Sequence, residues 1–273
     1  MQENQENIKI LAREHGPSIA YAQTPGATGA TGAKSTQDAP GLVFLGGFMS
    51  DMTGTKAIWL ENFAKSKGFA FLRFDYSGHG QSGGNFEDGT IGSWLEDVLH
   101  VLDHLTSGPQ LLIGSSMGGW LALLATLQRP EHICGLVGLA AAPDFTEDLV
   151  HNELTPKQRE TMMRDGVVYQ PSDYGDQPYA FTRDLVEDGR RHLLLTAPIK
   201  LECPVHLLHG YNDTDVPWQR SLTLLAQLQA GQMAPADIKA TLIPDADHRL
   251  ARDVDLDRIG ETVMDVLNAV KPD

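Results

Sequence analysis

Short apolar runs alternate with stretches of helical periodicity along most of the chain. The runs have the length of strands and occupy residues 18–23, 41–45, 69–74, 111–113, 133–142, 205–209 and 238–243. Apolar residues recur at helical spacing in the segments between and after them, at about residues 51–68, 90–105, 120–127, 217–229 and 254–270. Ser50 or Asp51 is expected to cap the first of these helices. The alternation predicts an α/β protein with a mainly parallel central sheet and helices on both faces.

This alternation is interrupted from about residue 143 to about residue 200. The segment contains helical pieces set among Pro, Gly and Tyr, with no clear strand, at residues 147–154, 156–163 and 181–195. It is too long for a plain connection, so it predicts a small helical lid over the sheet. A helical excursion that only adds stability is the alternative interpretation. The whole chain, residues 1–273, is expected to form one domain that carries this insertion.

Two glycine-rich segments resemble nucleotide-binding motifs without completing them. Residues 32–35, Gly-Ala-Lys-Ser, approach a phosphate-binding loop, but alanine stands where that motif needs glycine, and Pro40 leaves no room for its helix. Residues 24–41 are therefore expected to form an extended loop, whose role the sequence leaves open. Residues 78–83 match the dinucleotide fingerprint, yet loop residues follow instead of a helix. They are expected to shape a turn beside the active site.

The segment between residues 111 and 127 carries the strongest chemical signal. Gly114-Ser115-Ser116-Met117-Gly118 lies between a predicted strand and a predicted helix. A serine at the tip of such a sharp turn has a strained backbone, and strand and helix crowd the positions two residues before and after it. Glycine fits these positions because it has no side chain. The bare pentapeptide is weak evidence on its own, so the flanking elements make Ser116 a candidate nucleophile.

A serine hydroxyl needs a base to take its proton and an acid to orient that base. His248 follows the last predicted strand, and Asp213 follows the strand before it. Because the carboxyl ends of parallel strands meet at one edge of a sheet, both are expected near Ser116. Asp215 is the next candidate for the acid, and Asp144 is a further alternative, since loop position alone does not separate neighbouring carboxylates.

The remaining histidines are expected to have structural or surface positions. His209 closes a predicted strand and is expected to be a buried, hydrogen-bonded support, whereas His79 lies in the glycine-rich loop as a solvated or turn-stabilising imidazole. Two histidines, His151 and His192, fall in the predicted lid. Four more are expected to be structural or exposed, namely His100, His104, His132 and His206.

Backbone amides are candidates for the oxyanion hole. The Met117 amide lies at the start of the helix that follows Ser116, and the Phe48 amide follows Gly46-Gly47 at the end of a strand. With these donors, attack by Ser116 gives an acyl-enzyme that water then hydrolyses. Neither a metal nor an organic cofactor is required by this chemistry.

Composition narrows the partners and the compartment. The net charge of −15, from 36 acidic and 21 basic residues, argues against binding to nucleic acid or to an anionic membrane. No run of 18 apolar residues is present, so no membrane span is expected. Cys134 and Cys203 have no metal or redox spacing. The first ten residues read as neither a signal peptide nor a mitochondrial leader, and the expected location is the cytoplasm.

The chain resembles a serine α/β-hydrolase over nearly its full length. GSSMGG, HGYNDTDVP and DHR follow the serine, acid, histidine order of that superfamily, which implies its fold and Ser116, Asp213 and His248 as the catalytic triad. RFDYSGHGQSGG, SGPQLLIGSSMGGWL, CPVHLLHG, VPW and DHR are further similar to mitochondrial α/β-hydrolase domain proteins that act as palmitoyl-protein thioesterases and acyl-glucuronide esterases. This resemblance implies hydrolysis of an acyl thioester or activated ester, in a small molecule or an S-acylated protein. Gly46-Gly47 departs from the His-Gly common in the superfamily.

Other readings of the same residues stay open. A serine peptidase or amidase would use the same triad, and a noncatalytic member of the fold would use the pocket as a receptor. Dehalogenases and epoxide hydrolases need a carboxylate at the position of Ser116. The acyl-chain length and the oligomeric state are not determined by the sequence. Lid residues that either line an acyl channel or form a simple lid core are Met162, Met163, Tyr169, Tyr174, Tyr179 and Phe181.

Overall fold

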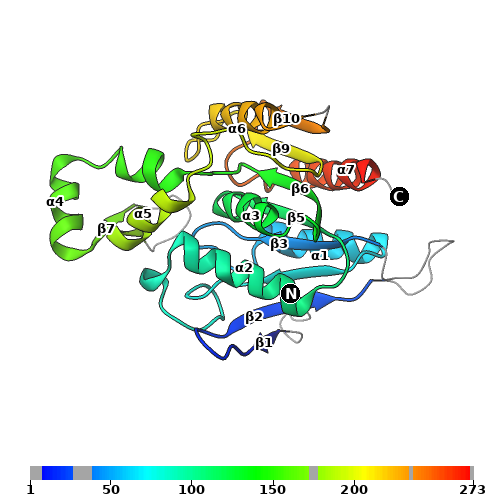
Figure 1. Ribbon diagram of the computed structural model, residues 1–273, viewed down its shortest axis with the longest axis horizontal. Coiled ribbons are helices and arrows are strands. Elements are labelled where there is room, and N and C mark those ends of the chain that lie inside the picture. The colour runs from blue at the N-terminus through cyan, green and yellow to red at the C-terminus, as the bar shows by residue number, and fades with distance from the viewer. Residues whose placement is uncertain (1–7, 27–38, 172–177, 234–235, 271–273) are drawn as a thin grey trace.

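A twisted sheet runs through the centre of the computed structural model, which describes residues 8–26, 39–171, 178–233 and 236–270 (Figure 1). Within these residues the sheet has eight strands in the order β1-β2-β4-β3-β5-β6-β9-β10. The strands β1 and β2 pair antiparallel, as do β2 and β4, and every other pair is parallel. Their bounds are Lys9–Leu11, Ile19–Thr24, Phe71–Phe74, Gly41–Leu45, Gln110–Ser115, Ile133–Leu139, Val205–Gly210 and Ile238–Ile243, in sheet order. The predicted mainly parallel sheet is confirmed.

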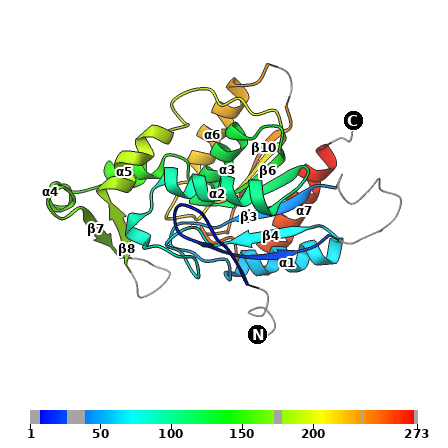
Figure 2. The same ribbon diagram turned by 60° about the horizontal axis from the view of Figure 1, so that its bottom comes forward.

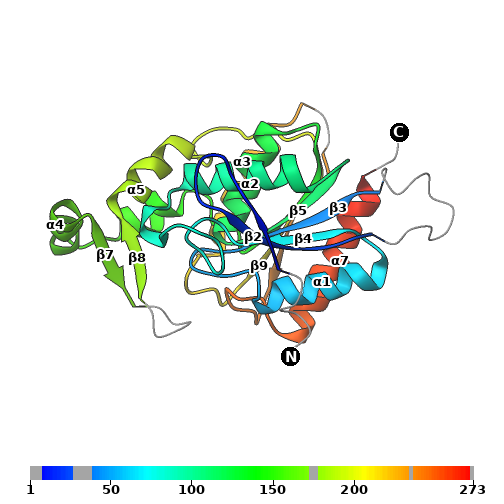
Figure 3. The same cartoon turned by 90° about the horizontal axis from the view of Figure 1, so that it is seen from below.

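Helices cover both faces of this sheet, as the alternation predicts. In Figure 3, α2 and α3 lie on one side of the strands and α1 and α7 on the other. Buried side chains of α6 pack in the same hydrophobic cluster as those of α2 and α3, whereas α1 and α7 share a second cluster. The helix bounds are Thr55–Lys67 for α1, Ile91–Leu105 for α2, Met117–Gln128 for α3, Gln219–Ala230 for α6 and Asp253–Ala269 for α7.

Two local expectations about the N-terminal half were wrong. The helix α1 begins at Thr55 after an N-cap at Gly54, so neither Ser50 nor Asp51 caps it. Both side chains instead form hydrogen bonds within the preceding turn. The three-residue strand β1 was not predicted, because a piece this short at a sheet edge has no readable alternation. Residues 78–83 do lie in a loop, as expected, whereas most of the predicted loop 24–41 lies outside the described residues.

The segment between β6 and β9 contains the predicted lid and is called the lid below; it projects from one end of the sheet at the left of Figures 1 and 2. It contains a π-helical turn, the helix α4, the strands β7 and β8, the helix α5 and a 3-10 turn. The bounds are Thr146–His151, Pro156–Asp165, Val167–Gln170, Tyr179–Thr182, Arg183–Gly189 and Arg190–His192, in that order.

The expectation that the lid holds no strand was wrong. The strands β7 and β8 pair antiparallel, with Val168 opposite Phe181. Each is only four residues long, so neither shows a clear periodicity, and each becomes a strand through its partner rather than through its own sequence. The predicted helix at 181–195 begins only at Arg183, where the Thr182 side chain accepts a hydrogen bond from the Leu185 amide and caps it.

Candidate active site

Ser116 lies at the turn between β5 and α3, at the centre of the sheet. Its backbone has φ 53° and ψ −118°, a conformation that an ordinary side chain rarely adopts and that costs about 1–3 kcal/mol. The turn is held by backbone hydrogen bonds: the Ser116 amide donates to the Leu139 carbonyl at 2.9 Å, and its carbonyl accepts from Gly119 and Ala142 at 2.9 and 3.1 Å. The surrounding backbone therefore keeps Ser116 in this strained geometry.

The two glycines of the motif occupy the crowded positions that the spacing predicts. A Cβ on Gly114 would overlap the carbonyl of Gly118, and a Cβ on Gly118 would overlap the carbonyl of Leu45 at the end of β3. Any side chain at either position would push the strand and the helix apart. The spacing of this motif is thus a steric requirement of the turn.

Three of the residues proposed from the sequence meet at the carboxyl edge of the sheet. His248, in the loop after β10, places Nε2 3.1 Å from the Ser116 hydroxyl. Its Nδ1 lies 2.7 Å from a carboxylate oxygen of Asp213, in the loop after β9. Backbone hydrogen bonds tie these two loops together, from Tyr211 to Ile243 and from Asn212 to Ala246. The result is one hydrogen-bonded chain from a carboxylate through an imidazole to a serine.

Asp213 is a fully buried carboxylate with a complete set of donors. Its Oδ1 accepts hydrogen bonds from the amides of Asp215 and Val216 at 3.0 and 2.8 Å. Its Oδ2 lies 2.9 Å from His209 as well as 2.7 Å from His248. Burial alone would raise the pKa of Asp213, but the hydrogen bonds from the two histidines hold it well below its usual range. The group therefore stays ionised beside His248.

His209 is the buried support expected from the sequence, and it has a further contact that the sequence did not indicate. Its Nε2 faces two acceptors, the Asp213 carboxylate and the Val216 carbonyl, both at 2.9 Å, so this nitrogen carries a hydrogen. Its Nδ1 lies 2.7 Å from the Ser221 hydroxyl, which can donate to it. The four-residue spacing in HGYND was the only local signal of a link between His209 and Asp213.

The structure separates the other candidate acids from this chain. Asp215 contributes its backbone amide to Asp213, while its side chain lines the cavity. Asp144 is buried with φ 62° and accepts the amides of Leu194 and Leu195, both at 2.8 Å. These contacts join the beginning and the end of the lid, so the side chain of Asp144 fastens the lid at its base.

His79 is not solvated. Its ring packs among Tyr76, Phe86 and Trp94, with Nδ1 3.3 Å from the Ser77 carbonyl. Burial lowers the pKa of His79 to about 4, so the imidazole is neutral at physiological pH. His79 instead stabilises the turn, which was the other expectation, because its ring fills space inside the glycine-rich loop.

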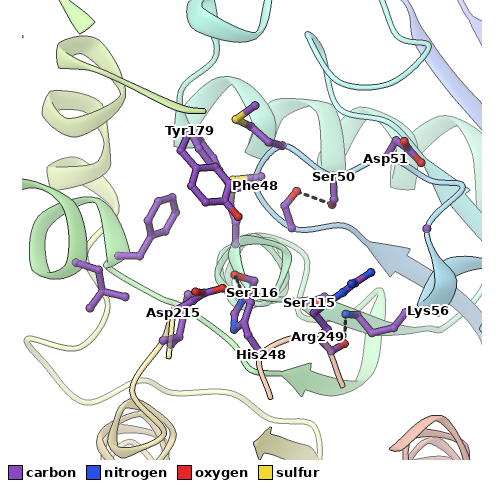
Figure 4. A pocket seen from close by; sticks show the side chains of 18 of the residues that line it. Phe48, Ser50, Asp51, Lys56, Ser115, Ser116, Tyr179, Asp215, His248 and Arg249 are labelled. Carbon is purple, nitrogen blue, oxygen red and sulfur yellow. Dashed lines mark hydrogen bonds between the residues drawn. The ribbon is translucent and has the colours of Figure 1, made fainter. Parts of the chain in front are cut away.

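Ser116 and His248 open onto a cavity of about 660 Å³ between the sheet edge and the lid (Figure 4). One side is polar and includes Ser50, Asp51, Lys56 and Arg249. The apolar part of the lining is supplied by the loop after β3 and by the lid, and Figure 4 shows its Phe48 and Tyr179 on the other side of the pocket from Lys56 and Arg249. Its residues are Phe48, Ala142, Phe145, Leu149, Val150, Tyr179 and Phe181. The cavity beside Ser116 thus has an apolar wall and a polar wall.

The lid residues considered for an acyl channel divide between wall, core and surface. Tyr179 and Phe181 line the cavity, and Met162 is buried in the core of the lid. Met163 and Tyr169 are exposed, at 66% and 54%, and Tyr169 donates a hydrogen bond to Glu87. Tyr174 lies outside the described residues.

The two candidate oxyanion donors come from the residue after Ser116 and from the loop after β3, where Gly47 lies beside Ser116. Met117 is the first residue of α3, so its amide has no partner within the helix. Phe48 follows β3 at the neighbouring strand end and also lines the cavity. Its ring packs against those of Phe86, Trp94, Phe145, Tyr179 and Phe181, with the Phe181 ring stacked at 5.2 Å. The backbone at Phe48 is therefore anchored by an aromatic cluster that includes the lid.

Other possible sites are absent from the described parts of the chain. No group of three or more His, Cys, Asp or Glu side chains there is arranged to hold a metal ion. No helix among these residues is long and apolar enough to cross a membrane. Cys134 and Cys203 are both free thiols, and burial raises their pKa values to about 11 and about 12. Neither cysteine is therefore a ready nucleophile.

Comparison with known proteins identifies the family. The model of the alpha/beta hydrolase fold family matches residues 40–182. The chain belongs to the α/β-hydrolases. Over 267 residues this hydrolase is 38% identical to the mitochondrial palmitoyl-protein thioesterase ABHD10 of Mus musculus, covering 96% of this chain and 83% of the mouse protein.

Solved structures of similar chains agree over nearly the whole hydrolase. A putative hydrolase from Agrobacterium vitis superposes with a TM-score of 0.87 at 39% identity, covering 96% of this chain and 98% of the other. The structure of mouse ABHD10 gives a TM-score of 0.83 at 36% identity, covering 97% of this chain and all 100% of the mouse chain. The similarity therefore includes the lid as well as the central sheet.

Proposed function

We propose that this hydrolase cleaves acyl thioesters or carboxylic esters through an acyl-enzyme on Ser116. The observation that carries the proposal is the hydrogen-bonded chain from Asp213 through His248 to Ser116, which opens onto a cavity with an apolar wall. Similarity to a palmitoyl-protein thioesterase over 96% of the chain favours acyl substrates. The substrate is either a small molecule or an S-acylated protein.

In the first step, Ser116 Oγ attacks the acyl carbonyl carbon while His248 Nε2 takes the hydroxyl proton. The carbonyl π pair moves onto oxygen, and the amides of Met117 and Phe48 donate hydrogen bonds to the resulting oxyanion. Asp213 keeps Nδ1 of His248 protonated and stabilises the imidazolium. These roles use the strained serine, the free helix amide and the buried carboxylate described above.

In the second step, the tetrahedral intermediate collapses and the bond to the leaving thiol or alcohol breaks. His248 returns its proton to the leaving sulfur or oxygen, which leaves an acyl-enzyme on Ser116. Water then attacks this ester while His248 takes a proton from it. The bond between Ser116 Oγ and the acyl carbon breaks as His248 returns that proton to Oγ, so the acid product departs and the serine hydroxyl is restored.

The two sides of the cavity suggest how the substrate lies. The acyl chain would pack along the apolar wall, where Phe145, Tyr179 and Phe181 give it an environment that excludes water. The leaving group would then face the polar wall at Ser50. Burial of each acyl methylene contributes about 0.8 kcal/mol, so activity should rise with chain length until the wall is filled.

Replacement of Ser116 by alanine tests the proposal directly. A fluorophosphonate probe should label the unmodified protein and fail to label Ser116→Ala, and hydrolysis of acyl thioesters and p-nitrophenyl esters should disappear with the label. Ser66→Ala, at an exposed serine of α1, is the matched control and should keep both. Persistent labelling of Ser116→Ala would reject this site. Faster turnover of a matched amide than of the thioester would instead favour a peptidase.

The proposed compartment is the cytoplasm, as expected from the sequence, although the mouse relative is named a mitochondrial protein. Fractionation of cells that contain the native protein, followed by fluorophosphonate labelling of each fraction, distinguishes the two compartments. Labelling of the native protein confined to mitochondria would overturn the cytoplasmic proposal.

A further inference from the structure

Lys56 is a cation in the cavity wall that the proposed chemistry leaves unused. It lies in the first turn of α1, and its Nζ donates a hydrogen bond to the backbone carbonyl of Arg249. Arg249 directly follows His248 in the chain, and Figure 4 shows this contact within the polar part of the pocket lining. A side chain 193 positions away in sequence is thus bonded to the backbone beside the proposed base.

The other contacts of the His248 loop come from different directions. The Asp247 carboxylate accepts the amides of Arg249 and Leu250, at 3.0 and 3.2 Å, and so holds the loop to itself. The Asn212 amide donates to the Ala246 carbonyl at 2.9 Å and holds the loop to the one after β9. Lys56 adds a hydrogen bond from α1, across the cavity wall. This contact ties the loop to α1, in addition to the ties within the loop and to the loop after β9.

We propose that Lys56 is a positioning residue, which holds the backbone beside His248 so that Nε2 stays within hydrogen-bond distance of Ser116. The inference rests on the proposed function, since it concerns the base of that reaction. A hydrogen bond of 3.1 Å between His248 and Ser116 leaves little room for movement of the loop. A shift of about 1 Å in a catalytic group can lower the rate by about 100-fold.

The charged surroundings of Lys56 make this restraint sensitive to pH. Burial, followed by the Arg249 guanidinium, lowers the pKa of Lys56 to about 8, while Asp247 and Asp213 act in the opposite direction. Asp51 and His248 face the same cavity. Below about pH 8 the ammonium makes a charge-assisted hydrogen bond, and above it the neutral amine makes a weaker one. The positioning effect should therefore weaken as pH rises through about 8.

The test compares Lys56→Met and Lys56→Arg with the unmodified protein. Methionine keeps the length of the side chain and removes the donor, so kcat for a neutral p-nitrophenyl ester should fall roughly 10- to 100-fold with KM nearly unchanged. Arginine keeps a donor and should restore most of kcat. Lys67→Met, at the exposed end of the same helix, is the matched control and should leave both constants unchanged.

The dependence of kcat on pH distinguishes a positioning role of Lys56 from a purely structural one. The unmodified protein should lose part of its kcat above about pH 8, and Lys56→Met should lack this decline. An unchanged kcat in Lys56→Met, or a raised KM with unchanged kcat, would overturn the inference, and the second result would make Lys56 a substrate contact. If Lys56→Met does not fold, two other measurements decide. The inference is overturned if Lys56→Arg loses activity and the kcat of the unmodified protein does not change above about pH 8. Activity retained in Ser116→Ala would reject the proposed function itself.

Discussion

The carboxyl edge of the sheet and the lid enclose the same cavity but are held in place in different ways. At the edge, Ser116, Asp213 and His248 lie on loops that directly follow strands of one sheet, and backbone hydrogen bonds fix these loops to one another. In the lid, Phe181 reaches the cavity from a hairpin that forms a separate two-stranded sheet. The positions of these three residues at the edge are therefore fixed by the backbone of the strands and loops.

The lid is held mainly through side chains. Buried apolar residues of the lid, including Phe145, Leu185 and Val186, belong to the same hydrophobic cluster as α2 and α3. Asp144 holds the base of the lid, the Trp120 indole donates to the His192 carbonyl at 3.0 Å, and Asp188 accepts the Gly92 amide at 2.7 Å. The stacked rings of Phe48 and Phe181 join the hairpin to the loop after β3. Substitutions at the carboxyl edge are therefore expected to change kcat, whereas substitutions in the lid are expected to change stability and substrate preference.

The largest effect is expected from Asp213→Asn. The amide would present an N–H group to His248 or His209 where each now donates to the carboxylate, so His248 would be held in the wrong tautomer. We expect kcat to fall by about 10³–10⁴-fold. Asp215→Asn should lose far less activity, because its side chain does not orient His248 in this geometry. A reversed order of the two variants in steady-state assays would break the assignment of the acid.

A smaller effect, of a different kind, is expected from Phe181→Ala in the lid. Loss of a buried ring should destabilise the protein by about 3 kcal/mol, measured by urea unfolding. It should also lower kcat/KM for long acyl esters more than for acetate esters, because part of the apolar wall is lost. Phe63→Ala, which removes a ring stacked on Trp59 away from the cavity, is the control. An equal dependence on chain length in both variants would contradict the role of the lid.

The smallest effect is expected from Asp144→Asn. Asparagine keeps one acceptor oxygen, so one of the two hydrogen bonds from Leu194 and Leu195 is lost, at a cost of about 1–2 kcal/mol. Amide hydrogen exchange at Leu194 and Leu195 should become faster, with kcat for a short ester close to that of the unmodified protein. Loss of activity on a short ester with unaltered exchange would return Asp144 to the candidates for the catalytic acid.

Two parts of the chain show how far local sequence carries the prediction of structure. Gly114 is required by the close approach of Gly118 within the same turn, and Gly118 by the close approach of Leu45 at the end of β3, so the spacing of these glycines was enough to predict the turn, its strand and its helix. The strands β7 and β8 are stabilised by each other, and the short sequences of the two strands carry no such local demand. The helical reading of residues 181–195 was therefore wrong at its start.

The sequence by itself determined the alternation of strands and helices, the tight turn at Ser116 and the sheet edge to which Asp213 and His248 belong, because periodicity and steric exclusion act over short distances along the chain. Only the tertiary structure decided that His248 bonds to Asp213 instead of Asp215, that His209 shares this carboxylate and that Lys56 reaches the loop beside His248. Those contacts depend on the order of strands in the sheet and on the packing of α1 against one of its faces. Such relations join residues far apart in the chain, and no local pattern encodes them.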